Sequence, residues 1–267
     1  MLAALRVLWR ALVSLYDESL LLIRANVVWF VGTIPFFLVI LALSWIFVPP
    51  TEPDSPPLVW PLLLAAFAVL VLPSPFAVGL YGLAAVIVTG DTPDFGVFWA
   101  SVRRWWRRGL AMFAISAFVL VALVFNTWFY VSVTEGWLQA VSVLWLYAIL
   151  FWITLQVYLV PLLIASEEPE SSDAAGQGAD ERGGQEPEAG APLPLRTLYR
   201  RAAILTLANP IFSLLLLAGA VFPALLSTLV PPVYPLVAMA YVALIGARGL
   251  RHLRDKYLPP DPEEAAE

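Results

Sequence analysis

The sequence predicts an all-α polytopic membrane protein with six transmembrane helices, an N-terminal amphipathic helix and a second interfacial amphipathic helix in a loop. Hydrophobic residues make up 61% of the 267 residues and charged residues 13%, whereas a soluble domain averages roughly 45–50% and about 25%. A helix needs roughly 20 apolar residues to cross ~30 Å of hydrocarbon. Six apolar segments approach or exceed that length: 25–48, 58–88, 109–131, 137–165, 203–230 and 232–247.

All fifteen Lys and Arg residues fall on one side of the topology that these segments define. Cytoplasmic loops of membrane proteins carry the excess of Lys and Arg. We therefore expect a multi-pass protein of the bacterial cytoplasmic (inner) membrane with its N-terminus and C-terminus in the cytoplasm. The stretches that hold the basic residues are 1–24, 89–108, 166–202 and 248–267, and those without any are 49–57, 132–136 and a turn near 231.

Residues 1–24 form the predicted N-terminal amphipathic helix. At 100° per residue, its polar side chains share one arc and its large apolar side chains fall outside that arc. Such a helix lies along the inner leaflet and leads into the first span; a helix that docks a partner protein is the alternative. The polar side chains are Arg6, Arg10, Ser14, Asp17, Glu18 and Arg24, and the apolar ones are Leu5, Leu8, Trp9, Leu12 and Leu15.

The second apolar segment, 58–88, is too long for one helix perpendicular to the membrane, at about 1.5 Å per residue. Pro73 and Pro75 lie inside it, and each removes a backbone hydrogen bond and obstructs the preceding turn. We expect one kinked or broken span, in which Gly79 and Gly82 allow another helix to approach closely. Two re-entrant half-helices are the alternative, which the charge pattern disfavours.

Residues 93–108 predict the second amphipathic helix, which lies in the membrane interface on the cytoplasmic side. Aromatic side chains occupy one half of its helical wheel and four arginines occupy the other half. Anionic lipid headgroups at the inner leaflet are the expected contact, and a cytoplasmic partner protein is the alternative. The candidate contact residues are Arg103, Arg104, Arg107, Arg108, Trp99, Trp105 and Trp106.

Four amide side chains remain at depth in the predicted spans. Hydrogen bonds of this kind between membrane helices contribute roughly 0.6–2 kcal/mol. We interpret these amides as packing contacts, and the alternative is a pathway for a polar solute. The candidate intramembrane polar contacts are Asn26, Asn126, Gln156 and Asn209.

The rest of the domain organisation follows from composition. Residues 25–165 contain spans 1–4, and residues 195–258 contain spans 5–6 with a basic anchor. The intervening segment 166–194 is a predicted disordered acidic cytoplasmic loop, because it holds eight acidic residues and one arginine but few large apolar side chains. The tail 259–267 is also predicted to be disordered.

Several chemistries have no residues to support them. The chain has no cysteine and a single histidine, so a metal centre or cofactor site is not expected. No span carries a charged residue near its middle, which argues against proton coupling and intramembrane proteolysis. A phosphate-binding Gly-rich loop is missing, and nothing indicates nucleic-acid binding. We therefore predict a protein that is not an enzyme.

Short motifs in residues 20–225 resemble the YesL-like family of bacterial integral membrane proteins of unknown function. These motifs are 22–29, 75–80, 98–99, 158–163 and 208–210. The resemblance implies six helical spans and an association with carbohydrate uptake, and it carries over no catalytic or binding residue. We expect a non-enzymatic accessory or scaffold protein, associated with a carbohydrate ABC transporter subunit. The alternative is a small permease or channel for a neutral polar solute.

Overall fold

The computed structural model describes residues 2–47, 74–132, 136–166 and 193–257. Within these ranges every regular element is a helix, and the fold is that of an all-α polytopic membrane protein, as predicted. Five helical stretches are long and apolar enough to cross a membrane: Ser19–Val39, Phe95–Ser132, Gly136–Ala165, Pro210–Leu229 and Tyr234–Tyr257. About half of the second predicted span, 58–88, lies outside the described residues. The same is true of most of the acidic loop 166–194 and of the whole tail 259–267.

Ten helical elements follow one another along the described chain. Two of them are short: η1 is a 3-10 helix and η2 a π-helix. In order they are α1 (Leu2–Asp17), α2 (Ser19–Phe47), α4 (Pro75–Thr89), α5 (Phe95–Ser132), η1 (Gly136–Ala140), α6 (Val141–Ala165), α7 (Leu195–Ala208), α8 (Pro210–Leu229), η2 (Tyr234–Ala238) and α9 (Met239–Tyr257).

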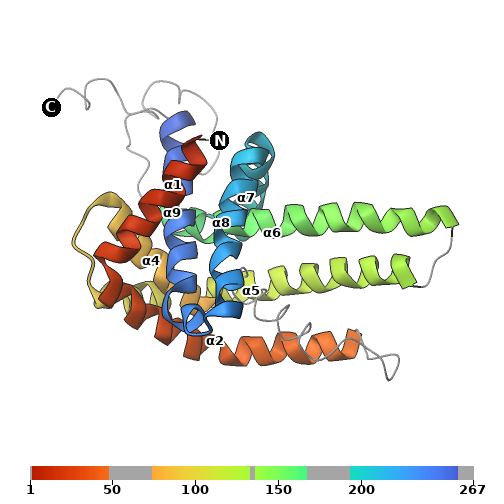
Figure 1. Ribbon diagram of the computed structural model, residues 1–267, viewed down its shortest axis with the longest axis horizontal. Helices are drawn as coiled ribbons and strands as arrows, with labels where there is room; N and C mark the ends of the chain where they lie inside the picture. The colour runs from red at the N-terminus through yellow and green to blue at the C-terminus, as the bar shows by residue number, and fades with distance from the viewer. Residues whose placement is uncertain (1, 48–73, 133–135, 167–192, 258–267) are drawn as a thin grey trace, which may run out of the picture.

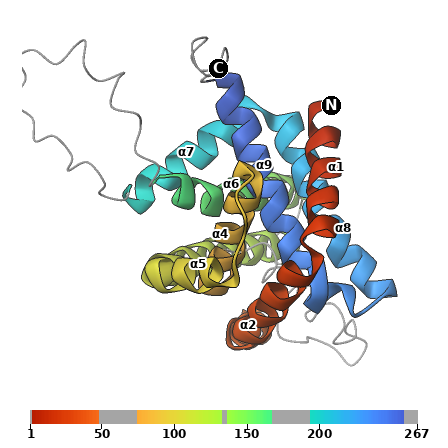
Figure 2. The ribbon, with the colours of Figure 1, turned by 90° about the vertical axis from the view of Figure 1, so that its left-hand side faces the viewer.

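The long helices form two sets that run in different directions. In Figure 1, α2, α5 and α6 lie horizontally and extend to one side, whereas α1, α8 and α9 run across them. Figure 2 looks along α2 and α5, and there α1, α8 and α9 are seen lengthwise. The core of the molecule lies where the two sets meet.

Burial follows this division. The largest fully buried side chains include Trp29, Phe98 and Tyr158, all in the region where the two sets meet. Farther along the second half of α5 and the first half of α6, apolar side chains such as Phe118 and Tyr147 are 75% and 67% exposed. Apolar surface of this kind is what a lipid-facing helix presents.

Helix α5 is one continuous helix where an interfacial helix and a separate span were expected. The sequence analysis separates an interfacial helix at 93–108 from a span at 109–131, whereas α5 runs unbroken from Phe95 to Ser132. The helix begins after Asp94, whose side chain accepts a 2.9 Å hydrogen bond from the Gly96 backbone N–H. At about 1.5 Å per residue α5 is roughly 57 Å long, well beyond the hydrocarbon thickness.

The aromatic face of residues 95–108 packs on protein rather than on lipid. It lies against α4, which folds back along the first half of α5. Small residues permit this approach: a Cβ at Gly79 would come within 2.6 Å of the Phe98 ring. Phe98 and Trp105 are consequently buried, and the predicted lipid-facing underside of this helix is the wall of the core.

Prolines set two other helix boundaries. Helix α4 begins at Pro75, and the Ser74 hydroxyl accepts a 3.1 Å hydrogen bond from the Ala77 N–H. The part of segment 58–88 that precedes Ser74 lies outside the described residues. The predicted span 203–230 is divided into α7 and α8, because Pro210 cannot continue the backbone ladder of α7.

Candidate functional site

Three of the predicted contact arginines lie on the outer face of α5. Arg103, Arg104 and Arg107 are exposed, and we call them the arginine ridge. Arg103 and Arg104 are consecutive, and Arg107 follows them one helical turn later. Their helix is fixed from behind, because Phe98, Val102 and Trp105 are buried against the core. The ridge is therefore a positively charged surface on a rigid support.

The fourth arginine and the tryptophans have other surroundings. Arg108 donates a 2.8 Å hydrogen bond to the Leu193 carbonyl, and its guanidinium lies 5.5 Å from the Trp105 ring centre. Trp99 and Trp106 remain 37% and 40% exposed. The structure thus gathers the predicted residues on one stretch of α5, where Trp105 is buried while Trp99, Trp106 and three of the arginines stay exposed.

Asn26 is fully buried and bonds to the start of the last span. Its side-chain N–H groups donate to the carbonyls of Tyr234 and Pro235 at 3.1 and 2.9 Å, and its carbonyl accepts from the Ala240 N–H at 2.7 Å. These are backbone groups of the π-helical turn η2 and of the start of α9. The prediction placed Asn26 at the inner end of span 1 and the turn near 231 on the outer side. The structure brings these two parts of the chain into contact.

Gln156 belongs to a buried cluster that joins α5, α6 and α7. The Ser116 hydroxyl donates to the Gln156 carbonyl at 3.0 Å and lies 2.9 Å from the Tyr199 hydroxyl. Burial raises the pKa of the Tyr199 hydroxyl, against a smaller lowering by Ser116, so this group is neutral at pH 7. Gln156 Nε2 is buried without a hydrogen-bond partner among the described residues.

Asn126 and Asn209 lie in two further places. Asn126 donates a 2.7 Å hydrogen bond to the Ala122 carbonyl of its own helix. The Asn209 carbonyl accepts hydrogen bonds from Lys256 and Tyr257 at 3.1 and 3.0 Å, near the end of α9. The four predicted amides therefore belong to four separate hydrogen-bond groups, each with a structural role.

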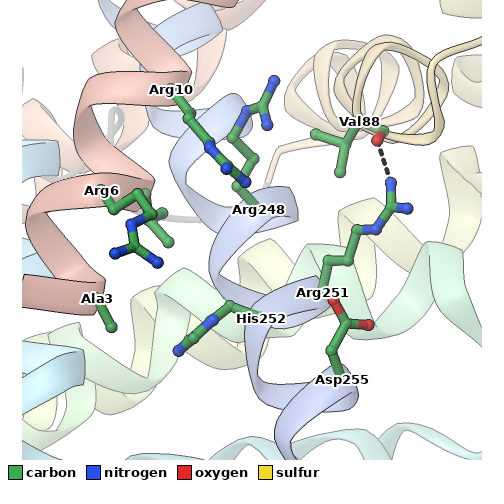
Figure 3. Close-up of a pocket in the computed structure, with 9 residues that line it drawn as sticks. Ala3, Arg6, Arg10, Val88, Arg248, Arg251, His252 and Asp255 are labelled. Carbon is green, nitrogen blue, oxygen red and sulfur yellow. Dashed lines mark hydrogen bonds between the residues drawn. The ribbon is translucent and has the colours of Figure 1, made fainter. Parts of the chain in front are cut away.

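A second basic feature, which the sequence analysis did not predict, lies between α1 and α9 (Figure 3). It is a pocket of about 380 Å³, which we call the arginine pocket. Arg6 and Arg10 enter it from α1, and charged side chains of α9 line the opposite side. Its polar residues are Arg6, Arg10, Arg248, Arg251, His252 and Asp255.

The arginine pocket is strongly positive. Four arginines against one aspartate leave an excess of three positive charges, with the histidine counted as neutral. Arg251 donates to the Val88 carbonyl at the end of α4, and Arg248 donates to the Ser14 hydroxyl. The Nε of Arg248 is buried and has no hydrogen-bond partner among the described residues.

Sequence reasoning assigned these arginines to two unrelated roles, an interfacial helix and a membrane anchor. The signal within each helix is visible, because Arg6 and Arg10 are four residues apart and Arg248, Arg251 and Asp255 share one face of α9. Ser14 of α1 and Arg248 of α9 are 234 residues apart in the chain, so only the packing of the two helices reveals the pocket.

No group of three or more metal-binding side chains occurs in the part of the chain that the structure describes. No protein-family model, curated protein or solved structure gives a match to this sequence. The arginine ridge, the arginine pocket and the arrangement of the helices are the features that bear on function.

Proposed function

We propose that this chain is a non-enzymatic accessory or scaffold protein of the bacterial inner membrane, which docks an acidic cytoplasmic surface of a partner on the arginine ridge. The resemblance to the YesL-like family makes a carbohydrate ABC transporter subunit the expected partner. The observation that supports docking is the ridge itself, a row of exposed arginines on a helix whose opposite face is held in the core.

The length of α5 supports a protein partner over lipid alone. If the uncharged residues 110–132 span the membrane, Arg103 lies seven residues before that span, or about 10 Å beyond it along the helix. The headgroup layer on each side is roughly 5–8 Å thick. The ridge thus begins at headgroup level near Arg107 and extends past it, where an acidic protein surface can reach it.

Charge supports the same interpretation. Arg103 and Arg107 form no ion pair or hydrogen bond with any residue that the structure describes, although they repel one another. Guanidinium groups bind carboxylates through paired hydrogen bonds, which makes an acidic surface their natural complement. Binding of this kind is sensitive to salt, because exposed charges are screened over about 8–10 Å at moderate ionic strength.

The permease interpretation has less support. It was motivated by amides that would line one pathway, whereas Asn126, Gln156 and Asn209 have separate hydrogen-bond partners. Neither the ridge nor the arginine pocket contains any of these amides. We therefore retain the accessory role as the proposed function.

The chain's single lysine, Lys256, permits a sharp test of docking. A variant with Arg103→Lys and Arg107→Lys keeps the charge of the ridge and introduces two amines that carbodiimide couples directly to carboxylates. In native membranes we expect cross-linked peptides that join residue 103 or 107 to Asp or Glu of one partner protein. High salt should abolish the coupling.

The matched control carries Arg196→Lys and Arg200→Lys, which are exposed and equally spaced on α7. It should not couple to the same partner peptide. Docking is contradicted if the ridge variant yields no partner peptide that the control lacks. A partner outside any transport system would remove the sugar-uptake setting and leave the docking role.

A further inference from the structure

The arginine pocket has no part in the docking role proposed above, yet it is lined by arginines of two helices that are distant in the chain. The side chain of Arg251 turns towards the Val88 carbonyl at its edge. Arg6 and Arg10 lie one turn apart on α1, and Arg248 and Arg251 extend from α9 on the opposite side (Figure 3). The pocket is partly open and combines a volume of about 380 Å³ with an excess of positive charge. A ligand for it should be an anion.

Most of the donors around the pocket have no partner. Each guanidinium carries five N–H groups, and Arg6 and Arg10 make no hydrogen bond or ion pair with any described residue. Arg248 uses one donor on Ser14, while its Nε is buried and unpaired. The buried Nε of Arg248 and the like charges around it are unfavourable, and one anion among them would relieve both.

The geometry favours a phosphate group over a carboxylate. A carboxylate has two oxygens in one plane, whereas a phosphate offers several oxygens that accept hydrogen bonds from donors on different sides. A charge near −2 also matches a pocket with an excess of three positive charges better than −1 does. The volume leaves space for a substituent on the phosphate.

The outer surface of α1 indicates where such an anion could come from. Beside its arginines, α1 exposes a strip of large apolar side chains, a pattern typical of a helix at the membrane interface. A phospholipid lying against this strip would hold its phosphate at the level of Arg6 and Arg10. The strip consists of Leu2, Leu5, Trp9, Leu12, Val13 and Tyr16, which are 42–82% exposed.

We propose that the arginine pocket between α1 and α9 binds a phosphate group, carried by an anionic phospholipid or by a soluble phosphate compound. The bound phosphate joins the first and last described helices, because Arg6 and Arg10 belong to α1 while Arg248 and Arg251 belong to α9. This binding is independent of the arginine ridge, so either proposal can fail without the other.

The test uses the full chain, purified in a neutral detergent and stripped of lipid. One arm adds phosphatidic acid or phosphatidylcholine and counts retained lipid by native mass spectrometry. The other arm titrates inorganic diphosphate by calorimetry. We expect binding of phosphatidic acid, of diphosphate or of both, and none of phosphatidylcholine. The arm that binds identifies a lipid or a soluble source.

The variant is Arg6→Gln with Arg10→Gln, two exposed residues whose replacement leaves the core intact. The substitutions remove two charge-assisted contacts to the phosphate, so the affinity should fall about tenfold or more. The control, Arg196→Gln with Arg200→Gln, removes the same charge at the same spacing on α7 and should bind like the natural chain. The proposal is overturned if neither anion binds, or if the pocket variant and the control bind equally.

Discussion

Single polar side chains in this protein bond to backbone groups of distant helices. Asn26 is the clearest case, since its amide offers one acceptor and two donors to three backbone groups at the start of α9. The π-helical turn η2 contains Pro235, which has no N–H and therefore donates no backbone hydrogen bond. The side chain of a distant helix bonds to this part of the backbone.

Replacing Asn26 with leucine should destabilise the protein markedly. The substitution removes all three hydrogen bonds that join Asn26 of α2 to η2 and α9, and the loss of a partner costs a buried polar group roughly 1–3 kcal/mol. Asn126→Leu is the matched control, because that amide bonds only to the Ala122 carbonyl of its own helix. We expect thermal unfolding in detergent to show a large loss for the first variant and a small one for the second. Equal losses would contradict a bridging role for Asn26.

At the scale of elements, the α4–α5 hairpin decides the character of the arginine ridge. Glycines on α4 lie against Phe98, Ser101 and Val102 of α5, so the two helix backbones approach closely. This packing buries Phe98, Val102 and Trp105, which belong to the face predicted to lie on lipid. A helix with one face in the core and one charged face is a rigid platform rather than a membrane-surface helix.

A disulfide test can verify the hairpin, because the chain contains no cysteine of its own. Gly82 lies directly against the Ser101 side chain, and a Cβ at Gly82 would lie 2.7 Å from the Ser101 Cβ. Disulfide Cβ atoms are about 3.8 Å apart, so Gly82→Cys with Ser101→Cys should cross-link under mild oxidation once the two helices separate by about 1 Å. Gly82→Cys with Arg103→Cys is the control, since Arg103 is exposed on the outer arc of α5. Peptide mapping would measure both yields. An interfacial helix separate from α4 would give equally low yields for the two pairs.

At the scale of the whole molecule, the two directions of helices raise a question of topology. The ring centres of Phe36 in α2 and Phe113 in α5 lie 4.7 Å apart, so the two helices are in contact at this level. The Tyr234 ring before α9 lies 5.8 Å from that of Trp29, in the first half of α2. The contact between Trp29 and Tyr234 lies on the order of 40 Å from the far end of α5, counted from Trp29 to Phe36 along α2 and from Phe113 to Ser132 along α5. That separation is about the thickness of a bilayer.

We therefore expect the turn between α8 and α9 to be inaccessible from the face reached by the α5–α6 connection. Single cysteines at Trp137 and Val230, both exposed, can be probed with a membrane-impermeant thiol reagent on intact cells. Trp137→Cys should be labelled, and Val230→Cys should react only after permeabilisation. Labelling of both from outside would instead support the topology of six parallel spans that the charge pattern predicts.

The residues of the candidate site were predictable only in part. The basic cluster of α5 and the buried position of Asn26 follow from local patterns, namely charge on one helix face and an amide in an apolar run. The continuity of α5 could not be predicted, because aromatic residues beside arginines suit either a lipid interface or a helix partner. The presence of α4 opposite Phe98 decides between them.

The sequence by itself determined that this is a helical membrane protein without cysteine chemistry and with its basic residues segregated between apolar segments. Hydropathy and charge are properties of short stretches, and the membrane imposes a helix on each apolar one. The tertiary structure alone decided that α8 and α9 run across the other long helices, that Asn26 caps η2, and that four arginines converge in a pocket. These features join residues far apart in the chain, such as Ser14 and Arg248, which are separated by 234 positions. Helix packing rather than local propensity brings such segments together.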